Sequence, residues 1–235
     1  MNHKFDKTVL MVFSLSVAGE YQRKPHSGFR KTAASVAVIN QCIKHTQAIA
    51  NDSEIELLWF SEEQQRGKTF AERYKNAIKF CFDAGYERVV SIGNDSPDLT
   101  ADIIREAAEK LLTHNIVAGP AEDGGVYLLG LNKATFDENL FVNLPWQQDS
   151  LYTAILETAE TQNLSVVSLA SLIDLDDVQS VNTYISRNPS SKIGWLLSQF
   201  NKIVRQKVAL PFQVVVLPKV HIATNPFRGP PAIFT

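Results

Sequence analysis

Short apolar segments alternate with amphipathic segments at helical spacing along most of this chain, and this alternation restricts the possible folds more than any other feature. Segments typical of buried strands cover residues 8–14, 54–60, 88–92, 115–118, 126–131 and 164–169. Segments typical of helices cover residues 33–50, 69–84, 100–113, 150–160 and 176–185. Strands that alternate with helices of this length form parallel sheets with helices on both faces. We therefore predict an α/β fold: a three-layer α/β/α sandwich with a mostly parallel central sheet.

Capping residues mark the limits of two expected helices. Thr69 and Glu72 have the spacing of a capping box, in which a hydroxyl and a carboxylate satisfy free backbone N–H groups reciprocally. Gly85 suits the left-handed position that ends a helix. Thr100 is placed to cap the next helix. These signals predict helix starts at residues 69 and 100.

The composition bounds the class of protein. The chain has 235 residues, enough for one large domain or two small ones, and its hydrophobic content of 45% provides a sizeable core. Lys and Arg number 23 against 25 Asp and Glu, so a formal net charge of -2 offers no general attraction for nucleic acid. Cys42 and Cys81 follow no metal-binding spacing. We expect both to be inert thiols in a reducing, cytoplasmic compartment.

The N-terminal segment MNHKFDKTVLMVFSLSVAG has two interpretations. Its basic start and apolar run resemble a short signal peptide. The alternative is a first buried strand, which a parallel sheet needs as a near-continuous apolar segment. Ser14 and Ser16 interrupt the apolar run, and we favour the strand. No segment reaches the roughly 18 apolar residues of a membrane-spanning helix.

The character of the chain changes near residue 188. Residues 1–188 carry the alternating strand and helix signals of the expected α/β domain, whereas residues 189–235 contain an amphipathic helix and a proline-rich tail. Prolines from Pro211 to Pro231 exclude a regular helix in that tail. Three interpretations stay open for the region: a segment packed on the domain, a homodimer contact, or a helix on a membrane surface.

An acidic turn, Gly93-Asn94-Asp95-Ser96-Pro97-Asp98, follows the expected strand at 88–92. Ligands of open α/β sheets bind outside the carboxyl ends of strands, and carboxylate oxygens suit Mg²⁺ or Mn²⁺. The alternative is that Asp95 and Asp98 are ordinary turn and cap residues. Its position just before Thr100 makes Asp98 mainly a helix-start residue.

Two later turns also carry carboxylates. In Gly119–Gly125, Asp123 can accept hydrogen bonds from ligand hydroxyls, and Gly124-Gly125 permits close approach of the backbone to a ligand; the same pattern also fits a plain β-turn. In Leu144–Ser150, Asp149 or Ser150 is a natural N-cap. Alternatively, Asp149 supplies a second metal or substrate carboxylate, because turns after strands meet at one edge of the sheet.

The three turns together resemble a known family. VVSIGNDSPDLT, AGPAEDGGVYLLGL and LPWQQDS are similar, in order and spacing, to the motifs of an uncharacterised bacterial glycosyltransferase-A-like family with a nucleotide-diphospho-sugar transferase fold. WFSEEQQRGKTFAERY resembles a further segment of that family. The resemblance covers about residues 8–186.

This resemblance implies a metal-dependent glycosyltransferase with a GT-A-like fold, acting on a nucleotide-diphospho-sugar and an unknown acceptor. Asn94 and Asp95 take the position that binds Mg²⁺ or Mn²⁺ and the diphosphate. Asp149 would complete the metal or acceptor site, and Asp123 and Asp149 are the candidate catalytic residues. The sugar or acceptor side would be lined by Asp123, Gly124, Gly125, Tyr127 and Trp146.

One segment departs from the family pattern. Many members carry a Pro-x-Pro-Gly-x-x-Lys-Thr-Arg-Leu loop after the first strand, where this chain has AGEYQRKPHSGFRKTAAS. Arg23, Arg30 and Lys31 are our candidates for binding the diphosphate, and a solvated basic loop is the alternative. Arg73, one turn into its helix, could reach the cleft or form a surface ion pair.

Two other functions remain. A nucleotidyltransferase of the same fold is one, although the Gly-x-Gly-x-Arg-Met loop of those enzymes is absent. A non-catalytic protein that binds a nucleotide or sugar phosphate is the other, and the altered first loop supports it.

Overall fold

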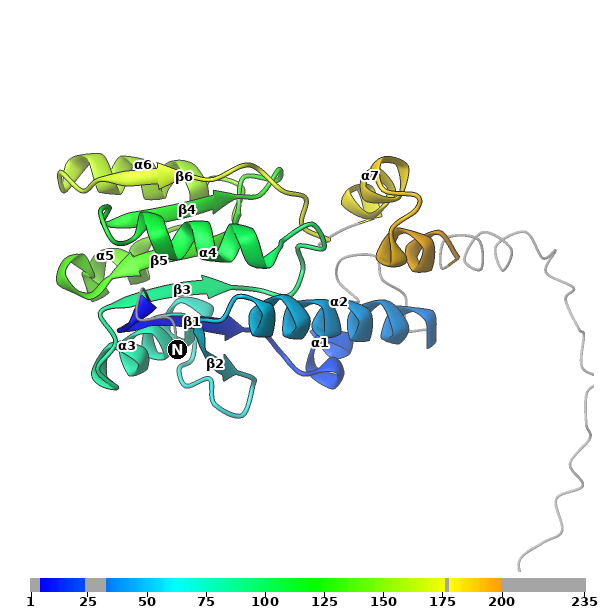
Figure 1. Cartoon of the computed structure of the whole chain (residues 1–235), viewed down its shortest axis with the longest axis horizontal. Helices are drawn as coiled ribbons and strands as arrows, with labels where there is room; N and C mark the ends of the chain where they lie inside the picture. Colours follow the sequence, from blue (N-terminus) through cyan, green and yellow to red (C-terminus); the bar gives the residue numbers. More distant parts are fainter. Residues whose placement is uncertain (1–4, 24–32, 176–177, 200–235) are drawn as a thin grey trace, which may run out of the picture.

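A six-stranded sheet forms the centre of the computed structural model, which describes residues 5–23, 33–175 and 178–199 (Figure 1). The strands are β1 (Thr8–Phe13), β2 (Glu56–Phe60), β3 (Arg88–Ile92), β4 (Ile116–Pro120), β5 (Val126–Asn132) and β6 (Val166–Ser168). Their order across the sheet is β2-β1-β3-β5-β4-β6. β5 pairs antiparallel with β3 and β4, and the other three pairings are parallel. The predicted mostly parallel sheet is confirmed, with β5 as its reversed strand.

Helices cover both faces of this sheet. Apolar side chains of α2 (Ala33–Asp52) and α4 (Ala101–Lys110) pack on one face, against strand residues such as Leu10 and Val90. Those of α3 (Phe70–Asp83), α5 (Glu138–Asn143) and α6 (Leu151–Thr161) pack on the other, against residues such as Met11 and Val89. Neighbouring strand residues thus face opposite cores, as the pleat requires. The predicted three-layer sandwich is confirmed.

The capping signals set the helix starts as expected. The Thr69 hydroxyl accepts a hydrogen bond from the Glu72 amide at 3.1 Å, and the Glu72 carboxylate accepts one from the Thr69 amide at 3.3 Å. Thr100 accepts a bond from the amide of Ile103, at 3.3 Å. Gly85 has a φ of 105°, in the region that favours glycine. Helices α3 and α4 therefore begin at Phe70 and Ala101.

Two short helices were not predicted. We expected a loop after the first strand, but α1 (Val17–Arg23) lies there. Its start is held by Glu62, whose carboxylate accepts hydrogen bonds from the amide and the hydroxyl of Ser16. These bonds lower the pKa of Glu62. Because the partner lies 46 positions away in sequence, no local signal marks this helix.

The second unpredicted helix, α5, spans six residues that we had expected to form a connection. The Asp137 carboxylate caps it by accepting hydrogen bonds from the amides of Asn139 and Leu140, at 2.8 and 3.0 Å. A capping residue followed by only six helical residues is too short a segment to show helical periodicity, so the sequence did not predict this helix. A 3₁₀ turn, η3 (Lys133–Thr135), precedes it.

A third, smaller core joins the C-terminal region to α2. Helix α7 (Val178–Arg187) is followed by a helical segment at residues 192–199, of which Ile193 and Leu197 are buried. They belong to one apolar cluster with Val38, Cys42 and Tyr184. The predicted boundary at residue 188 stays a prediction, and the tail at 200–235 lies outside the described residues. In the part of the chain that the structure describes, no helix is both long and apolar enough to cross a membrane.

Both cysteines are free and buried. Burial raises the pKa of the Cys81 thiol to about 12, which keeps it protonated and unreactive at neutral pH. This agrees with the expected structural role of that thiol.

Candidate functional site

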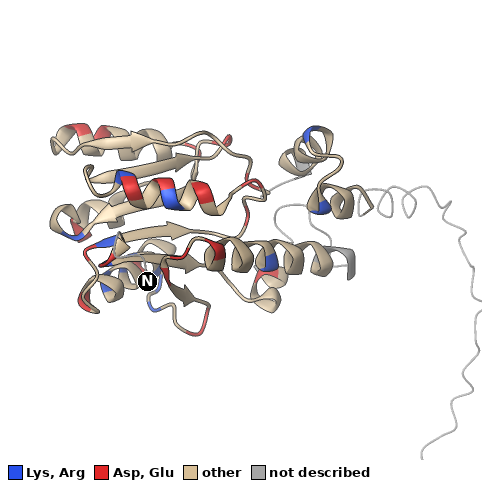
Figure 2. Ribbon diagram, viewed as in Figure 1, with Lys and Arg blue, Asp and Glu red and all other residues tan. Residues whose placement is uncertain are grey.

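A cleft of about 490 Å³ opens at the carboxyl ends of β1 and β3, beside the start of the reversed strand β5. The chain passes from β1 to β2 on one side and returns to β3 on the other, so the strand order reverses here. Such a reversal is where open α/β sheets bind ligands. Acidic residues (red) lie in the turns at this end of the sheet (Figure 2).

Residues from all three predicted turns line this one cleft. The predicted site residues that line it are Asn94, Asp95, Asp123, Gly125, Tyr127, Trp146 and Asp149. Gly124 is not among the lining residues. Arg30 and Lys31 lie outside the described residues, and of Arg23 only the backbone, at the end of α1, is described. The structure therefore gathers most of the predicted site, while the role of each residue stays a prediction.

The first turn is fastened to the segment that follows β6. The Leu175 amide donates to the Asp95 carbonyl at 2.9 Å, and the Ser96 hydroxyl donates to the Asp174 carboxylate. These backbone and side-chain bonds leave Asp95 and Asp174 on the wall of the same cleft. Asp174 was missed because it lies in an irregular segment, where no periodicity or motif marks it.

Asp98 has a different function from the one expected. The cap of α4 is Thr100. Asp98 instead accepts hydrogen bonds from the Tyr184 hydroxyl at 3.3 Å and from the side-chain amide of Asn188 at 3.5 Å. It therefore connects the first turn to α7 and the residue just beyond it.

The second turn is a tight connection between β4 and β5. The Ala121 amide donates to the Gly125 carbonyl, and the Gly124 amide donates to the Ala121 carbonyl. One carboxylate oxygen of Asp123 accepts a bond from the Gly125 amide at 2.9 Å, which fixes the side chain at the cleft. Both interpretations of this turn, structural and functional, are thus compatible with its geometry.

Gly124 makes its close approach to the protein itself. Its φ is 91°, and a Cβ at this position would lie 1.9 Å from the Asp149 carbonyl oxygen. The Tyr152 amide also donates to the Gly124 carbonyl at 3.0 Å. A glycine is needed here because the second and third turns pack backbone against backbone; contact of Gly124 with a substrate stays a prediction.

The third turn reaches the cleft by a route that we did not foresee. It follows the helix α5 rather than a strand, so the expectation that it would follow a strand was wrong. Ser150 precedes α6 but makes no capping hydrogen bond with its side chain. The Asp149 carboxylate is exposed, lines the cleft and has no hydrogen bond or ion pair with the residues described. The capping alternative is therefore not realised.

An aromatic cluster forms part of the wall of the cleft. Trp146 packs on Phe141, Tyr74 and Phe70 with ring centroids 4.6, 5.1 and 5.9 Å apart. Phe13, at the end of β1, lies 5.0 Å from the Tyr74 ring. Phe13, Phe70, Tyr74 and Trp146 all line the cleft. Burial raises the pKa of Tyr74 to about 12, so it stays a neutral phenol.

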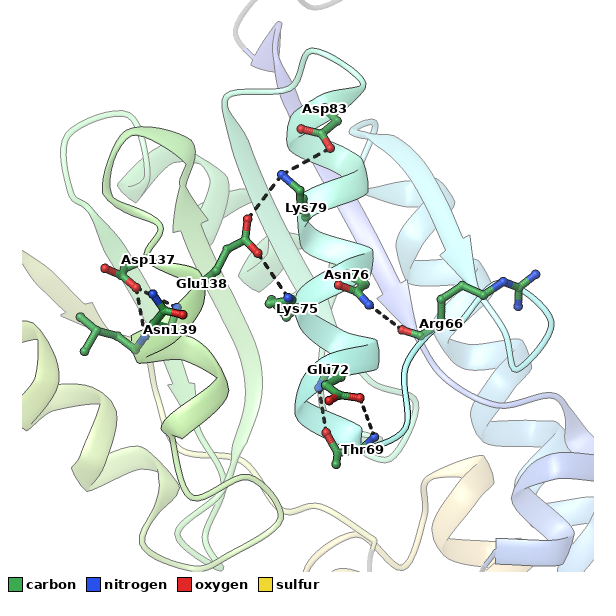
Figure 3. Close-up of polar contacts among 11 residues, drawn as sticks. Arg66, Thr69, Glu72, Lys75, Asn76, Lys79, Asp83, Asp137, Glu138 and Asn139 are labelled. Carbon is green, nitrogen blue, oxygen red and sulfur yellow. Dashed lines mark hydrogen bonds and ion pairs between the residues drawn. The ribbon is translucent and has the colours of Figure 1, made fainter.

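Helix α5 holds this wall against α3 through an ion-pair cluster (Figure 3). The Glu138 carboxylate lies 3.2 Å from the Lys75 ammonium and 3.4 Å from that of Lys79. At the other end of α5, the Trp146 indole N–H donates to the Phe141 carbonyl at 2.7 Å. The ion pairs of Glu138 and the hydrogen bond from Trp146 therefore position the start of the third turn.

Replacing Glu138 by glutamine is expected to lower the free energy of unfolding by about 0.5–1 kcal/mol at pH 7, since its partners are partly exposed. The hydrogen bond from Lys75 lowers the pKa of Glu138. A carboxyl whose pKa is lowered by folding stabilises the protein above its unfolded pKa, about 4.3. The difference between wild type and Glu138→Gln should thus shrink as the pH falls below that value and vanish below the lower pKa that Glu138 has in the folded state. Urea unfolding at pH 7 and pH 3 measures it; a difference as large at pH 3 as at pH 7 would contradict the ion-pair explanation.

The described lining of the cleft is acidic. Five carboxylates, those of Glu20, Asp95, Asp123, Asp149 and Asp174, face one guanidinium, that of Arg73. Arg73 donates to the Lys68 carbonyl at 3.4 Å and has no ion pair with the described residues, so it reaches the cleft rather than a surface carboxylate. Glu20 was missed because it was assigned to a loop.

This donor set limits how a metal ion could bind. Among the described residues, no group of three or more His, Cys, Asp or Glu side chains is placed to hold a metal ion together. Mg²⁺ and Mn²⁺ commonly bind through one or two carboxylates, with water and substrate phosphate oxygens completing the shell. The cleft carboxylates suit this kind of binding, in which water and substrate oxygens supply most of the ligands, and they do not form a site made of protein ligands alone.

Comparison with known proteins agrees with the sequence resemblance. Residues 29–148 match the family described as "Uncharacterized protein conserved in bacteria (DUF2064)". No curated protein matches the chain. A candidate nucleotide-diphospho-sugar transferase from Desulfovibrio desulfuricans G20 has a similar structure, with a TM-score of 0.72 and 22% identity over 85% of this chain and 97% of that one. This likeness shows the fold.

Two more distant structures have TM-scores below one half and carry no conclusion about this chain. One is 4-diphosphocytidyl-2C-methyl-D-erythritol synthase from Anaerococcus prevotii, with a TM-score of 0.49 and 9% identity over 86% of this chain and 100% of that one. The other is Rv0371C from Mycobacterium tuberculosis in complex with manganese, with a TM-score of 0.44 and 10% identity over 75% of this chain and 96% of that one.

Proposed function

This chain belongs to the DUF2064 family of bacterial proteins, and on that premise we propose that it is a metal-dependent transferase acting on a nucleotide-activated sugar. The observation that supports this most is the convergence of three acidic turns on one cleft at the strand-order reversal. Turns from residues 93–98, 119–125 and 144–150 meet there although only the first and second follow strands of the sheet. A cleft lined by both aromatic rings and carboxylates suits a ligand with both a ring and polar groups.

Asp95 and Asn94 are the proposed binding site for the diphosphate and its Mg²⁺ or Mn²⁺, with Asp149 as the second carboxylate. A divalent metal ion supplies charge stabilisation for the leaving diphosphate when it is bound. The acidic lining supports this assignment, because a diphosphate would be repelled by five carboxylates unless cations offset them. Arg73 contributes one positive charge from the start of α3.

Asp123 and Asp149 are the proposed catalytic residues. In a displacement at the sugar carbon, the bond to the diphosphate oxygen breaks while a bond to an acceptor oxygen forms, and the acceptor loses a proton. Either carboxylate can accept that proton as a general base. Gly125, Tyr127 and Trp146 line the part of the cleft proposed for the sugar or acceptor.

Ligand-linked stabilisation tests the proposal. Nucleoside diphosphates and nucleotide sugars are added to the protein with and without Mn²⁺, and the melting temperature is measured. A ligand at a hundredfold excess over its dissociation constant stabilises the folded state by about 2.7 kcal/mol, and we expect such a shift for at least one nucleotide sugar with Mn²⁺.

The outcomes separate three functions. No shift with any nucleotide ligand would exclude the transferase and the nucleotidyltransferase alike. Release of a nucleoside diphosphate from the bound sugar nucleotide identifies a glycosyltransferase, whereas release of pyrophosphate from a nucleoside triphosphate and a sugar phosphate identifies a nucleotidyltransferase. Binding without either product indicates a non-catalytic binding protein.

A further inference from the structure

The third turn presents hydrogen-bonding groups to the cleft that the protein itself does not use. Gln147, Gln148 and Asp149 are exposed and all three line the cleft. None of their side chains has a hydrogen bond or ion pair with the described residues. The turn beneath them is nevertheless firmly held, by Gly124 on one side and by the bond from Trp146 to Phe141 on the other. Two amides and one carboxylate are thus held at the cleft, available to a ligand.

The backbone at Gln147 adds an independent observation. Its φ is 64°, in the left-handed region that favours glycine. The Gln148 amide donates to the Pro145 carbonyl at 3.2 Å, which closes a turn with Trp146 and Gln147 at its centre. The second central position of such a turn is normally Gly or Asn when φ is positive. Gln147 therefore occupies a position that costs the fold conformational energy, which indicates a use for its side chain.

The chemistry of this turn selects among possible ligands. An amide both donates and accepts hydrogen bonds, as a hydroxyl does, whereas a phosphate accepts only and needs donors. Asp149, next to the two amides, accepts bonds from hydroxyls directly, whereas it would contact a phosphate only through a bound cation. Trp146 adds an apolar ring face at the same wall. Hydroxyl groups along one edge and an apolar face of C–H groups are the features of a carbohydrate ring.

We propose that Gln147 binds hydroxyl groups of a carbohydrate ring packed against Trp146, and that it determines which sugar the cleft accepts. This inference rests on the proposed function, which it deepens by assigning the sugar to the third turn and leaving the diphosphate to the first. Gln147 acts as a specificity residue and takes no part in the bond-breaking step.

Two substitutions test the assignment. Gln147→Gly removes both the amide and the conformational cost, and Gln147→Met keeps the length and the backbone strain but removes the amide. Saturation-transfer NMR with glucose, galactose, mannose and N-acetylglucosamine at millimolar concentration measures sugar binding directly. At least one sugar should bind wild type, and both variants should weaken that binding about fivefold or more, the effect of one or two lost hydrogen bonds.

The matched control lies outside the cleft. Asn163 also has a positive φ, 52°, and is exposed at the end of α6. Asn163→Gly should leave sugar binding unchanged. The melting temperature of Gln147→Gly should be no lower than that of wild type, because glycine adopts the turn without strain. A stabilised or equally stable variant with weaker sugar binding is the signature of a side chain kept for function.

Two results would overturn the inference: no monosaccharide binds wild type, or both Gln147 variants bind the sugar as wild type does. Failure of the proposed function is distinct from these. Sugar binding that depends on Gln147, without any effect of nucleotide ligands and Mn²⁺, would sink the transferase and leave this inference standing. Turnover of a nucleotide sugar with unchanged sugar preference in both variants would support the transferase and contradict the role of Gln147.

Discussion

Replacing Asp95 by asparagine is expected to lower turnover of a nucleotide sugar by at least about 100-fold and to abolish the Mn²⁺-dependent part of the thermal shift. A metal ion at a transferring phosphate contributes several kcal/mol of charge stabilisation, and each 1.4 kcal/mol is a tenfold change in rate. Asparagine keeps the size of the side chain and removes its charge. The hydrogen bond from the Leu175 amide to the Asp95 main-chain carbonyl does not depend on the side chain, so the variant keeps it.

The matched control for Asp95→Asn is Asp102→Asn. Asp102 lies in the first turn of α4, is exposed, and pairs with Arg105 rather than with the cleft. Its substitution should leave turnover and Mn²⁺ dependence unchanged. If Asp95→Asn keeps its response to Mn²⁺, the proposed metal position is wrong, whatever the effect on rate. Steady-state kinetics and melting curves over a Mn²⁺ titration make the comparison.

The layered architecture could be predicted because its signals are local. The near-continuous apolar runs of β1 and β3, the capping box at Thr69, and Gly85 at the end of α3 are each visible in a few neighbouring residues. Together these local signals predict the strands and helices without knowledge of any long-range contact. Helix α1 could not be predicted in this way, since the groups that hold its start belong to Ser16 and Glu62.

The site was predictable to the extent that it follows strands. Asp95 was placed by its position after β3, and Asp123 by the connection from β4 to β5. Asp149 was placed at the cleft for an incorrect reason, because the intervening helix α5 was not foreseen. Asp174 and Glu20 could not be found, because the segments that carry them reach the cleft only through tertiary contacts.

Gly124 shows how one glycine motif can have two different structural causes. A Gly-Gly pair next to a carboxylate suggests close approach of a ligand. In the structure Gly124 packs against the Asp149 carbonyl, and Gly125 lines the cleft. Sequence alone cannot distinguish these cases, because both require the same absence of a side chain.

Gly124→Ala is therefore expected to be among the most destabilising single substitutions in the turns around the cleft. Its φ of 91° strains an alanine, and the new Cβ would lie 1.9 Å from the Asp149 carbonyl oxygen, well inside van der Waals contact. Strain of this kind costs about 1–3 kcal/mol, and the overlap adds to it, so we expect a loss of at least about 3 kcal/mol in the free energy of unfolding. Urea unfolding measures this loss.

Gly85→Ala separates the two causes. Gly85 has a φ of 105°, and nothing lies within 4 Å of the Cβ position. Its substitution introduces backbone strain without overlap, and should cost about 1 kcal/mol. Equal losses for the two variants would mean that the contact between the turns is not what requires Gly124. Because the overlap can be relieved only by moving the third turn, Gly124→Ala should also lower turnover at temperatures where it remains folded, whereas Gly85→Ala should not.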